Sequence, residues 1–453
     1  DARKATTNLH AQQGLVTGEV PLTPIQHWFF EQNFVEPHHF NQAMLLEVPA
    51  DIKPELLQQV LEKLLRYHDA LRLQYIQIES RWQQINLDAS VSVPFEIVDL
   101  SNLTPAEQKI AITQKANERQ RVLNLSTGNL IEVVLFQLGV SSPGRLLIVI
   151  HHLAVDGVSW RILLEDLTTA YYQLLRGENI QLPAKTTSFK DWSSKLQDYA
   201  QEQKLYSELK YWLQYSHSFA TVLPVDYTHD KSTNVVGSSQ IVSVSLSKEQ
   251  TRNLLQDVPS VYNTQINDVL LSALVQSFTR WAGCNSLLVN LEGHGREDLF
   301  EGVELSRTVG WFTSVFPIQL KLKNSIHPGE TLKSIKEQLR QIPQRGIGYG
   351  ILRYINRDSN IREQLRALPQ PEISFNYLGQ FDQTQFGDGW KFAQESHGEI
   401  HSALGKRSHL LEIDGLIING RLQLDWRYSK NIHRQSTVET LANYYLQALE
   451  AII

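Results

Sequence analysis

Two adjacent histidines, His151 and His152, follow the apolar run 146–150 and precede the pair Asp156-Gly157. The run has the length of a buried strand, and successive side chains of a strand point to opposite faces. One imidazole can therefore pack inside the protein while the other faces a cavity, where a base at a strand end can do chemistry. The Asp-Gly pair allows a tight turn, and Asp156 could fix an imidazole ring or bind a buried arginine.

Two other interpretations of this histidine pair stay open. It could be a core pair beside a turn, which is the commoner case for two adjacent histidines. A metal site is less favoured, because the nearby sequence offers neither a third ligand nor a carboxylate cluster. Cys284 is the only cysteine, so an internal disulfide and a thiolate metal cage are excluded. We expect no bound metal, and we expect a second pair, His38-His39, at the surface.

The bulk composition narrows the class of protein. The chain has 453 residues, 42% of them hydrophobic and 20% charged, with a formal net charge of −6. This is the composition of an ordinary soluble globular protein, and the length is too great for one compact core. The charge favours neither nucleic acid nor an anionic membrane as a partner, and no apolar stretch could span a bilayer. We expect a cytoplasmic protein of two lobes.

The pattern along the chain predicts four segments. Residues 1–19 are polar and aperiodic, and are expected to be a linker from an upstream domain. Residues 20–220 form an N-terminal lobe with the histidine pair, and residues 221–238 form a crossing segment without periodicity. Residues 239–453 form a C-terminal lobe. Helical and strand patterns alternate in both lobes, which predicts the α/β class with mixed sheets.

Hydrophobic periodicity and capping signals predict the individual elements. A first helix is expected to begin at residue 24, and two more are expected between 189 and 214. The other expected helices cover residues 54–67, 105–121, 159–175, 266–281, 331–342 and 437–452. The expected strands cover 91–98, 131–138, 145–150, 241–246, 286–291 and 372–376. Asn419-Gly420, between the apolar runs 415–418 and 421–424, predicts a hairpin with a type I′ turn.

Residues 151–160 resemble the HHxxxDGxSW signature of the condensation superfamily of nonribosomal peptide synthetases, which is related to chloramphenicol acetyltransferase. The ending Ser159-Trp160 resembles the epimerization members of that superfamily. Further blocks resemble theirs in the same order: PLTPIQHWFF at 21–30, EGHGRE at 292–297, RTVGWFT at 307–313 with Phe316-Pro317, the Gly-rich 343–350, and FNYLGQFD at 375–382. Taken alone, 292–297 would be interpreted as a solvated loop.

The resemblance implies two chloramphenicol acetyltransferase-like lobes in a V around a central cleft or tunnel. It also implies that the α-carbon of an aminoacyl or peptidyl thioester is inverted from L to D, through an enolate. His152 and Glu292 are then the catalytic pair on opposite faces of the carbon, and either could be the base in a given direction. Asn376 and Tyr377 would bind the enolate oxygen or orient the carbonyl group.

Several other residues receive supporting roles from the resemblance. The residues expected to support the site are His151, Asp156, Gly157 and Arg296. The residues expected to bind substrate are Ser159, Trp160 and Trp311. An arginine is expected to pair with Asp156, and both Arg72 and Arg296 remain candidates.

The implied partner is a peptidyl carrier protein upstream in the same polypeptide, whose phosphopantetheine arm carries the substrate. A condensation domain is expected downstream, and the domain is expected to need no cofactor of its own. Three rivals are an amide-forming condensation domain, a catalytically silent carrier-binding module and a free-standing CoA-dependent acyltransferase. Glu292, Trp311 and the pair Asn376-Tyr377 favour epimerization over condensation, and an intact His152 argues against a silent module.

Overall fold

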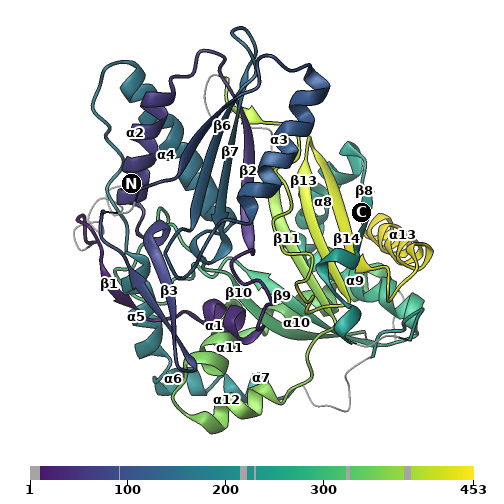
Figure 1. Ribbon diagram of the computed structural model, residues 1–453. Coiled ribbons are helices and arrows are strands. Elements are labelled where there is room, and N and C mark those ends of the chain that lie inside the picture. The colour runs from purple at the N-terminus through teal and green to yellow at the C-terminus, as the bar shows by residue number, and fades with distance from the viewer. Residues whose placement is uncertain (1–10, 91, 215–221, 229–230, 323–326, 382–388) are drawn as a thin grey trace. The chain divides into compact units, whose positions relative to one another are not determined.

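The computed structural model describes residues 11–90, 92–214, 222–228, 231–322, 327–381 and 389–453 (Figure 1). The chain forms two compact units. Unit 1 comprises Asp1–Tyr199, Arg296–Thr313 and Gln383–Ser402, and unit 2 comprises Ala200–Gly295, Ser314–Asp382 and Ala403–Ile453.

These units do not follow the single boundary that the sequence predicts at 221–238. Residues 296–313 and 389–402 belong to unit 1, although the sequence assigns them to the C-terminal lobe. Long-range contacts bring them there: Arg296 binds Asp156, and β12 (Lys391–Phe392) pairs with β2 (Asn41–Val48). Residues 1–10, 221 and 229–230, which the predicted linker and crossing segment include, lie outside the described residues.

Unit 1 contains two sheets. The larger has the order β12-β2-β7-β6-β5, and its other strands are β5 (Phe95–Asp99), β6 (Ile131–Gln137) and β7 (Gly144–His151). β5 and β6 run parallel, whereas the other neighbouring strands of this sheet pair antiparallel. The smaller sheet has the order β1-β4-β3, formed by β1 (Gly18–Val20), β3 (Leu73–Ile78) and β4 (Arg81–Asn86). The strand predicted at 91–98 begins at Phe95, and Val91 lies outside the described residues.

The helices of unit 1 begin largely where the sequence predicts them. They are α1 (Pro24–Glu31), α2 (Pro54–Tyr67), α3 (Pro105–Gln120), α4 (Gly157–Leu175) and α5 (Phe189–Tyr199). Proline occupies the first turn of α1, α2 and α3, where its missing N–H is harmless. Ile112 and Ala116 of α3 pack with Leu45, Val134 and Leu147 of the larger sheet in one core.

Unit 2 is built on a mixed six-stranded sheet of order β10-β9-β11-β13-β14-β8. Its strands are β8 (Ser239–Ser245), β9 (Ser286–Gly293), β10 (Ser314–Lys321), β11 (Ile373–Phe381), β13 (Leu411–Ile418) and β14 (Arg421–Ser429). β11 runs parallel to both β9 and β13, and the other pairs are antiparallel. Asn419 and Gly420 have φ values of 51° and 72°, as the predicted type I′ hairpin requires.

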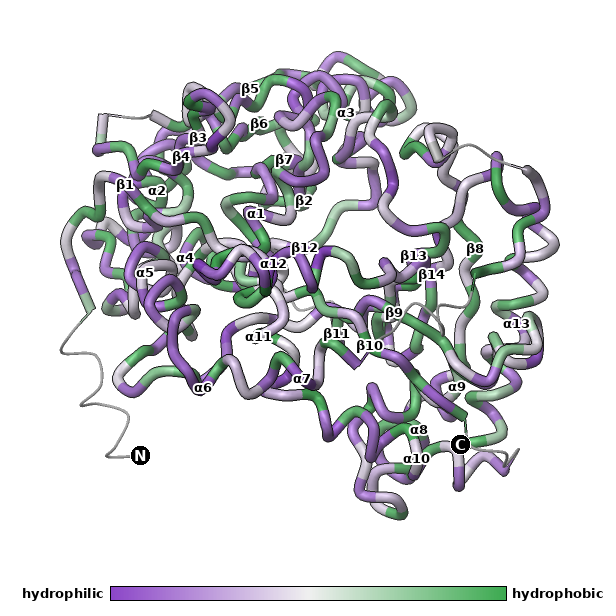
Figure 2. Tube along the Cα trace, turned by 90° about the horizontal axis from the view of Figure 1, so that it is seen from below, coloured by the Kyte–Doolittle hydropathy of each residue, from purple (hydrophilic) through white to green (hydrophobic). Residues whose placement is uncertain are grey.

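Helices cover one face of this sheet. The long helices of unit 2 are α8 (Lys248–Tyr262), α9 (Ile266–Ala282), α10 (Pro328–Arg340) and α13 (Gln435–Ile452). Its short helices are α6 (Gln203–Tyr206), α7 (Leu209–Trp212), α11 (Ile347–Gly350) and α12 (Ser359–Arg366). The fully buried Trp426 of β14 stacks on Phe278 of α9 and meets Tyr445 of α13 edge-on. Residues alternate between buried and partly exposed along β13 and β14, and their hydropathy can be followed in Figure 2. The other face of β13 and β14 carries the charged residues Glu412, Asp414, Asp425 and Arg427.

The structure confirms the predicted class, a mixed α/β fold. Two local differences concern the candidate site. The helix predicted at 159–175 begins at Gly157, because the Asp156 side chain accepts a hydrogen bond from the Ser159 N–H at 2.8 Å and caps it. β9 extends to Gly293, so Glu292 is a strand residue and not part of a solvated loop.

Candidate functional site

His152 is the first residue after β7, and hydrogen bonds define its imidazole. Its Nδ1 lies 2.8 Å from the Val155 carbonyl oxygen, which can only accept, so Nδ1 carries the proton in the neutral ring. Nε2 is then the basic nitrogen, and the Gln42 amide nitrogen lies 3.2 Å from it. The ring is partly exposed and stacks on Trp311 at 4.2 Å between centroids. Burial among protein atoms lowers the pKa of His152, so the imidazole is neutral at neutral pH.

His151, the last residue of β7, is fully buried and has the opposite tautomer. Its Nε2 lies 2.8 Å from the Pro37 carbonyl oxygen, and its Nδ1 accepts from the Leu153 N–H at 3.1 Å. Burial lowers the pKa of His151 to about 3. The two histidines thus divide as the strand pattern predicts, one packed inside and one partly exposed. The other pair, His38-His39, is not at the surface as predicted, because His39 is 8% exposed and hydrogen-bonded to the Glu399 carbonyl oxygen.

Asp156 forms a buried ion pair with Arg296. The Arg296 Nη2 lies 3.1 and 3.3 Å from the two carboxylate oxygens, and 3.0 Å from the Ser159 hydroxyl oxygen. The same carboxylate accepts from the Phe312 N–H at 3.1 Å, while the Arg296 Nη1 donates to the Leu305 and Thr308 carbonyl oxygens. The pair therefore ties the start of α4 to the segment 305–312.

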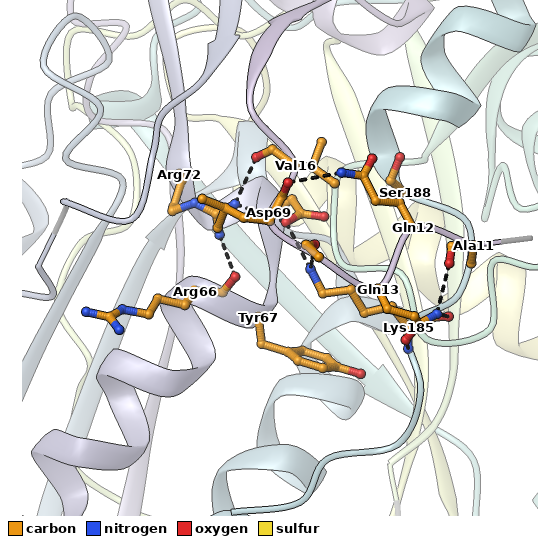
Figure 3. A network of polar contacts seen from close by, with 12 residues as sticks. Ala11, Gln12, Gln13, Val16, Arg66, Tyr67, Asp69, Arg72, Lys185 and Ser188 are labelled. Carbon is orange, nitrogen blue, oxygen red and sulfur yellow. Dashed lines mark hydrogen bonds and ion pairs between the residues drawn. The ribbon is translucent and has the colours of Figure 1, made fainter.

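Arg72, the other candidate partner, is fully engaged elsewhere (Figure 3). Its guanidinium donates to the carbonyl oxygens of Val16, Leu65, Arg66 and Leu87, and to Asp69 at 3.0 Å. Arg72 is completely buried, so these bonds hold the segments around β3 together. The partner of Asp156 is therefore Arg296, and not Arg72, the other arginine that the sequence leaves open.

The residues expected to bind substrate occupy different places. Ser159 and Trp160 are buried, and their polar groups already bind within unit 1: Ser159 Oγ bonds Asp156 and Gly310, and the Trp160 indole donates to Gln42 at 2.8 Å. Trp311 packs directly on His152. Gly157 is exposed, and a Cβ there would meet open space.

Glu292 lies at the end of β9, on the polar face of the unit 2 sheet. The Asn376 amide of β11 donates to its Oε2 at 2.9 Å. The side chain is exposed at the end of the strand, and desolvation by the protein around it raises the pKa of its carboxyl group to about 7. The negative charges of Asp414 and Glu412 on β13 add to the rise. Glu292 is therefore partly protonated at neutral pH and can give a proton as well as take one.

Asp414 shares the same surroundings and titrates before Glu292. Burial, followed by the charge of Glu412, raises its pKa to about 6. Glu412 itself is balanced by Arg407 at 3.2 Å and by Arg427 at 3.6 Å.

Tyr377 follows Asn376 on β11 and projects to the opposite side of the strand. Its ring lies against Gly415 of β13, where an added Cβ would be 3.6 Å from Tyr377 Cδ2. Burial raises the pKa of its hydroxyl group. The structure thus brings Asn376, but not Tyr377, into contact with Glu292.

Sequence reasoning missed two residues of these surroundings, Gln42 and Asp414. Gln42 is 110 positions before His152, and only the pairing of β2 with β7 brings the two together. Asp414 has a weak signal, because acidic residues alternate with apolar ones at 411–414.

The described part of the chain contains neither a metal-binding cluster nor a membrane-spanning helix. Among residues whose placement is described, no group of three or more His, Cys, Asp or Glu could hold a metal ion. Within the same residues, no helix combines the length and the apolar character needed to cross a membrane.

Comparison with known sequences identifies relatives across the whole chain. A family profile described as "Condensation domain" matches residues 16–453. A linear gramicidin synthase protein of Brevibacillus parabrevis is 48% identical over 453 residues, covering 99% of this chain and 6% of that protein. Gramicidin S synthase 1 of Brevibacillus brevis is 38% identical over 456 residues, covering 98% of this chain and 41% of that protein. The chain thus spans less than half the length of these relatives.

Solved structures with the same fold were also found. The epimerization domain from the third module of tyrocidine synthetase B has a TM-score of 0.90 and 38% identity, with 98% of this chain and 97% of that chain covered. The X-domain from teicoplanin biosynthesis has a TM-score of 0.76 and 18% identity, with 97% of each chain covered. The second likeness shows the fold alone.

Proposed function

Because this chain belongs to the condensation-domain family, with an epimerization domain among its structural relatives, we propose that it inverts an α-carbon. The substrate is an aminoacyl or peptidyl thioester on the phosphopantetheine arm of a carrier protein. The reaction takes the α-carbon from L to D, and back, by removal of a proton from one face and delivery of another proton to the opposite face.

The chemistry needs an acid and a base at once. A thioester carbonyl stabilises the carbanion as an enolate, but its α-proton remains weakly acidic compared with any side-chain base. A site must therefore bind the enolate oxygen and keep water away. Inversion also requires one group to remove the proton from one face while another group returns a proton to the opposite face.

The surroundings of Glu292 are the observation that carries the proposal: it stands at the end of β9, accepts a hydrogen bond from the Asn376 amide at 2.9 Å, and has Asp414 and Glu412 nearby, whose charges add to burial in raising its pKa. A carboxyl group with a pKa of about 7 can act as an acid at neutral pH, which an ordinary glutamate cannot. His152 supplies the complementary state, a neutral imidazole with Nε2 as its basic nitrogen. We assign these two residues to opposite faces of one α-carbon, each an acid in one direction and a base in the other.

The remaining assignments follow from their contacts. Asn376 positions Glu292 through its amide, and Trp311 provides an apolar wall beside His152. Tyr377 projects to the side of β11 opposite to Asn376, so it is not assigned to the enolate oxygen. Asp156 and Arg296 hold the start of α4, and His151 packs behind His152. Trp160 and Ser159 act from inside unit 1, through Gln42 and Asp156.

The proposal includes the expected partners. The phosphopantetheine arm belongs to a carrier protein upstream in the same polypeptide, and it enters as substrate, so no metal or cofactor is assigned to this chain. A condensation domain downstream would use the D-configured product. The setting is the cytoplasm, as the sequence predicts.

Chiral analysis of a loaded carrier protein tests the function. The carrier is loaded with an L-aminoacyl group and incubated with wild-type protein, and the amino acid is released and its configuration determined. We expect a mixture of L and D forms with the wild type. His152→Ala and Glu292→Gln should each slow conversion by about 10²–10⁴-fold, the usual contribution of one acid–base group.

Two substitutions outside the site serve as controls. Glu337→Gln changes an exposed carboxylate of α10, and His397→Ala changes a histidine of unit 1 whose Nδ1 lies 3.0 Å from the Gly398 carbonyl oxygen. Both should leave the rate unchanged. An acceptor aminoacyl carrier protein is then added. Formation of an amide product without any D form would contradict epimerization and support condensation.

A further inference from the structure

Gln42 lies beside His152 because β2 and β7 pair antiparallel. In this ladder Asn41 faces His151, and the His152 N–H donates to the Phe40 carbonyl oxygen at 2.9 Å. Gln42 is thus a diagonal neighbour of His152, within reach of a long side chain. Its amide nitrogen lies 3.2 Å from His152 Nε2, in front of the nitrogen that the proposed reaction uses.

Trp160 decides which end of the Gln42 amide faces the histidine. The indole N–H can only donate, and it lies 2.8 Å from Gln42 Oε1. The amide oxygen is therefore occupied, and the amide nitrogen must point to His152. Trp160 is 3% exposed and stands in the first turn of α4, so its own position is tightly held.

These contacts form a chain in which every donor meets an acceptor. Trp160 donates to Gln42, Gln42 donates to His152 Nε2, and His152 Nδ1 donates to the Val155 carbonyl oxygen. A proton on Nε2 would break this order, because it would point at the N–H₂ group of Gln42. The amide cannot rotate to offer its oxygen without losing the bond from Trp160.

We propose that Gln42, oriented by Trp160, is a positioning residue that keeps the resting imidazole of His152 neutral, with its proton on Nδ1 and its Nε2 as the acceptor of the Gln42 amide. The proposal rests on the proposed role of His152 as an acid–base group. A substrate C–H that approaches Nε2 takes the place of the Gln42 amide.

Among the other groups around His152, some favour protonation of its imidazole and others oppose it. Asp156 carries the charge that favours protonation, but it is paired with Arg296. His151 stays neutral, and the face of Trp311 would stabilise a cation at the imidazole. Burial opposes protonation, and the Gln42 amide opposes it at the one nitrogen that is free to gain a proton.

Nitrogen-15 NMR of histidine-labelled, ligand-free protein tests the assignment directly. The chain has 15 histidines, so the His152 signals are identified by their loss in His152→Ala. In the wild type, we expect Nδ1 to be protonated and Nε2 unprotonated. Trp160→Phe frees the amide to rotate, so the ratio of protonated to neutral imidazole at a fixed pH should rise about 3- to 10-fold, the equivalent of one hydrogen bond.

Substitution of Gln42 itself should have graded effects. Gln42→Glu places a carboxylate at Nε2 and should raise the same ratio about 10- to 1000-fold, with a matching shift of the acidic limb of the epimerization pH profile. Gln42→Ala should raise the ratio of protonated to neutral imidazole less than Gln42→Glu does. In the Gln42→Ala protein, Trp160→Phe should not change this ratio further, because Trp160 acts through Gln42.

Trp82→Phe and Gln77→Ala, in the neighbouring hairpin of β3 and β4, should leave the titration unchanged. An Nε2 that is protonated in the wild type, or a titration unaffected by Gln42→Glu and Gln42→Ala, would overturn the inference. The NMR readout needs no turnover. A protein that fails to epimerize but shows these shifts would therefore disprove the function and leave the inference intact.

Discussion

His152 of unit 1 and Glu292 of unit 2 both lie at the end of a strand, but the two units treat charge in opposite ways. Around His152, the nearby charges cancel in the Asp156–Arg296 pair, and the imidazole is surrounded by hydrogen bonds that suit its neutral form. Around Glu292, carboxyl groups gather on one sheet face, and their repulsion adds to burial in raising the pKa.

The two units use different surroundings to set the protonation state of a side chain at neutral pH. A neutral base at neutral pH can be obtained from a well-satisfied network, whereas a protonated carboxyl group requires surroundings that disfavour its charge. Unit 1 should therefore lose stability when its charges are removed, and unit 2 should gain stability when one of its carboxylates is removed.

The largest expected effect is on unit 1. Asp156→Ala removes the partner of the buried Arg296 and the cap of α4, and should destabilise the unit by about 3–5 kcal/mol. Asp156→Asn keeps an N-cap and should cost less. Hydrogen exchange of the α4 amides measures the change in this unit alone. Exchange rates unaltered by Asp156→Ala would show that the ion pair does not support α4.

A smaller loss is expected at a turn of unit 2. Gln344, Arg345 and Gly346 have φ values of 42°, 54° and 89° in succession, and a Cβ on Gly346 would lie 2.3 Å from ring atoms of Phe316. Gly346→Ala should therefore destabilise unit 2 by about 1–3 kcal/mol.

Gly157→Ala is the matched control in unit 1, because it has open space for a methyl group and no positive φ. It should be neutral or slightly stabilising in thermal unfolding. Equal losses for both glycine variants would contradict the steric explanation.

The third prediction concerns pH. Glu292 and Asp414 have folded-state pKa values of about 7 and about 6, above the usual values of carboxyl groups. The folded state thus binds these protons more tightly than the unfolded chain does. The stability of unit 2 should therefore fall as the pH rises from the ordinary carboxyl pKa to the folded-state values of about 6 and about 7. Asp414→Asn should reduce that fall and stabilise the unit at pH 8.

The same substitution should lower the pKa of Glu292, because it removes a neighbouring negative charge. The alkaline limb of the epimerization profile should then move to lower pH. Glu249→Gln, in α8, removes an equal charge outside this sheet face and should leave the profile in place. A limb that stays in place with Asp414→Asn would show that burial alone raises the pKa of Glu292.

Much of the local structure could be predicted from the sequence. Capping signals and periodicity predicted α1, α2 and α3 at their first residues, and Asn419-Gly420 predicted its hairpin. The ends of elements were harder, because β9 continues past its apolar residues to hold Glu292.

The surroundings of the candidate site could be predicted only in part. The motifs pointed to His152 and Glu292, but not to Gln42 or Asp414, whose positions depend on which strands pair. The division into units was also hidden, since Arg296 belongs with Asp156, 140 positions away. Contacts of this range leave no periodic trace in the sequence.

Exchange of the α-proton with solvent deuterium tests the central claim most directly. D- and L-aminoacyl carrier proteins are incubated separately in D₂O with wild type, His152→Ala and Glu292→Gln, and the deuterium content and configuration are determined. The wild type should incorporate deuterium while inverting both substrates. Each variant should lose inversion but still exchange the α-proton of one enantiomer, and the two variants should retain opposite enantiomers. Inversion without deuterium, or retention of the same enantiomer by both variants, would contradict two acid–base groups on opposite faces of one carbon.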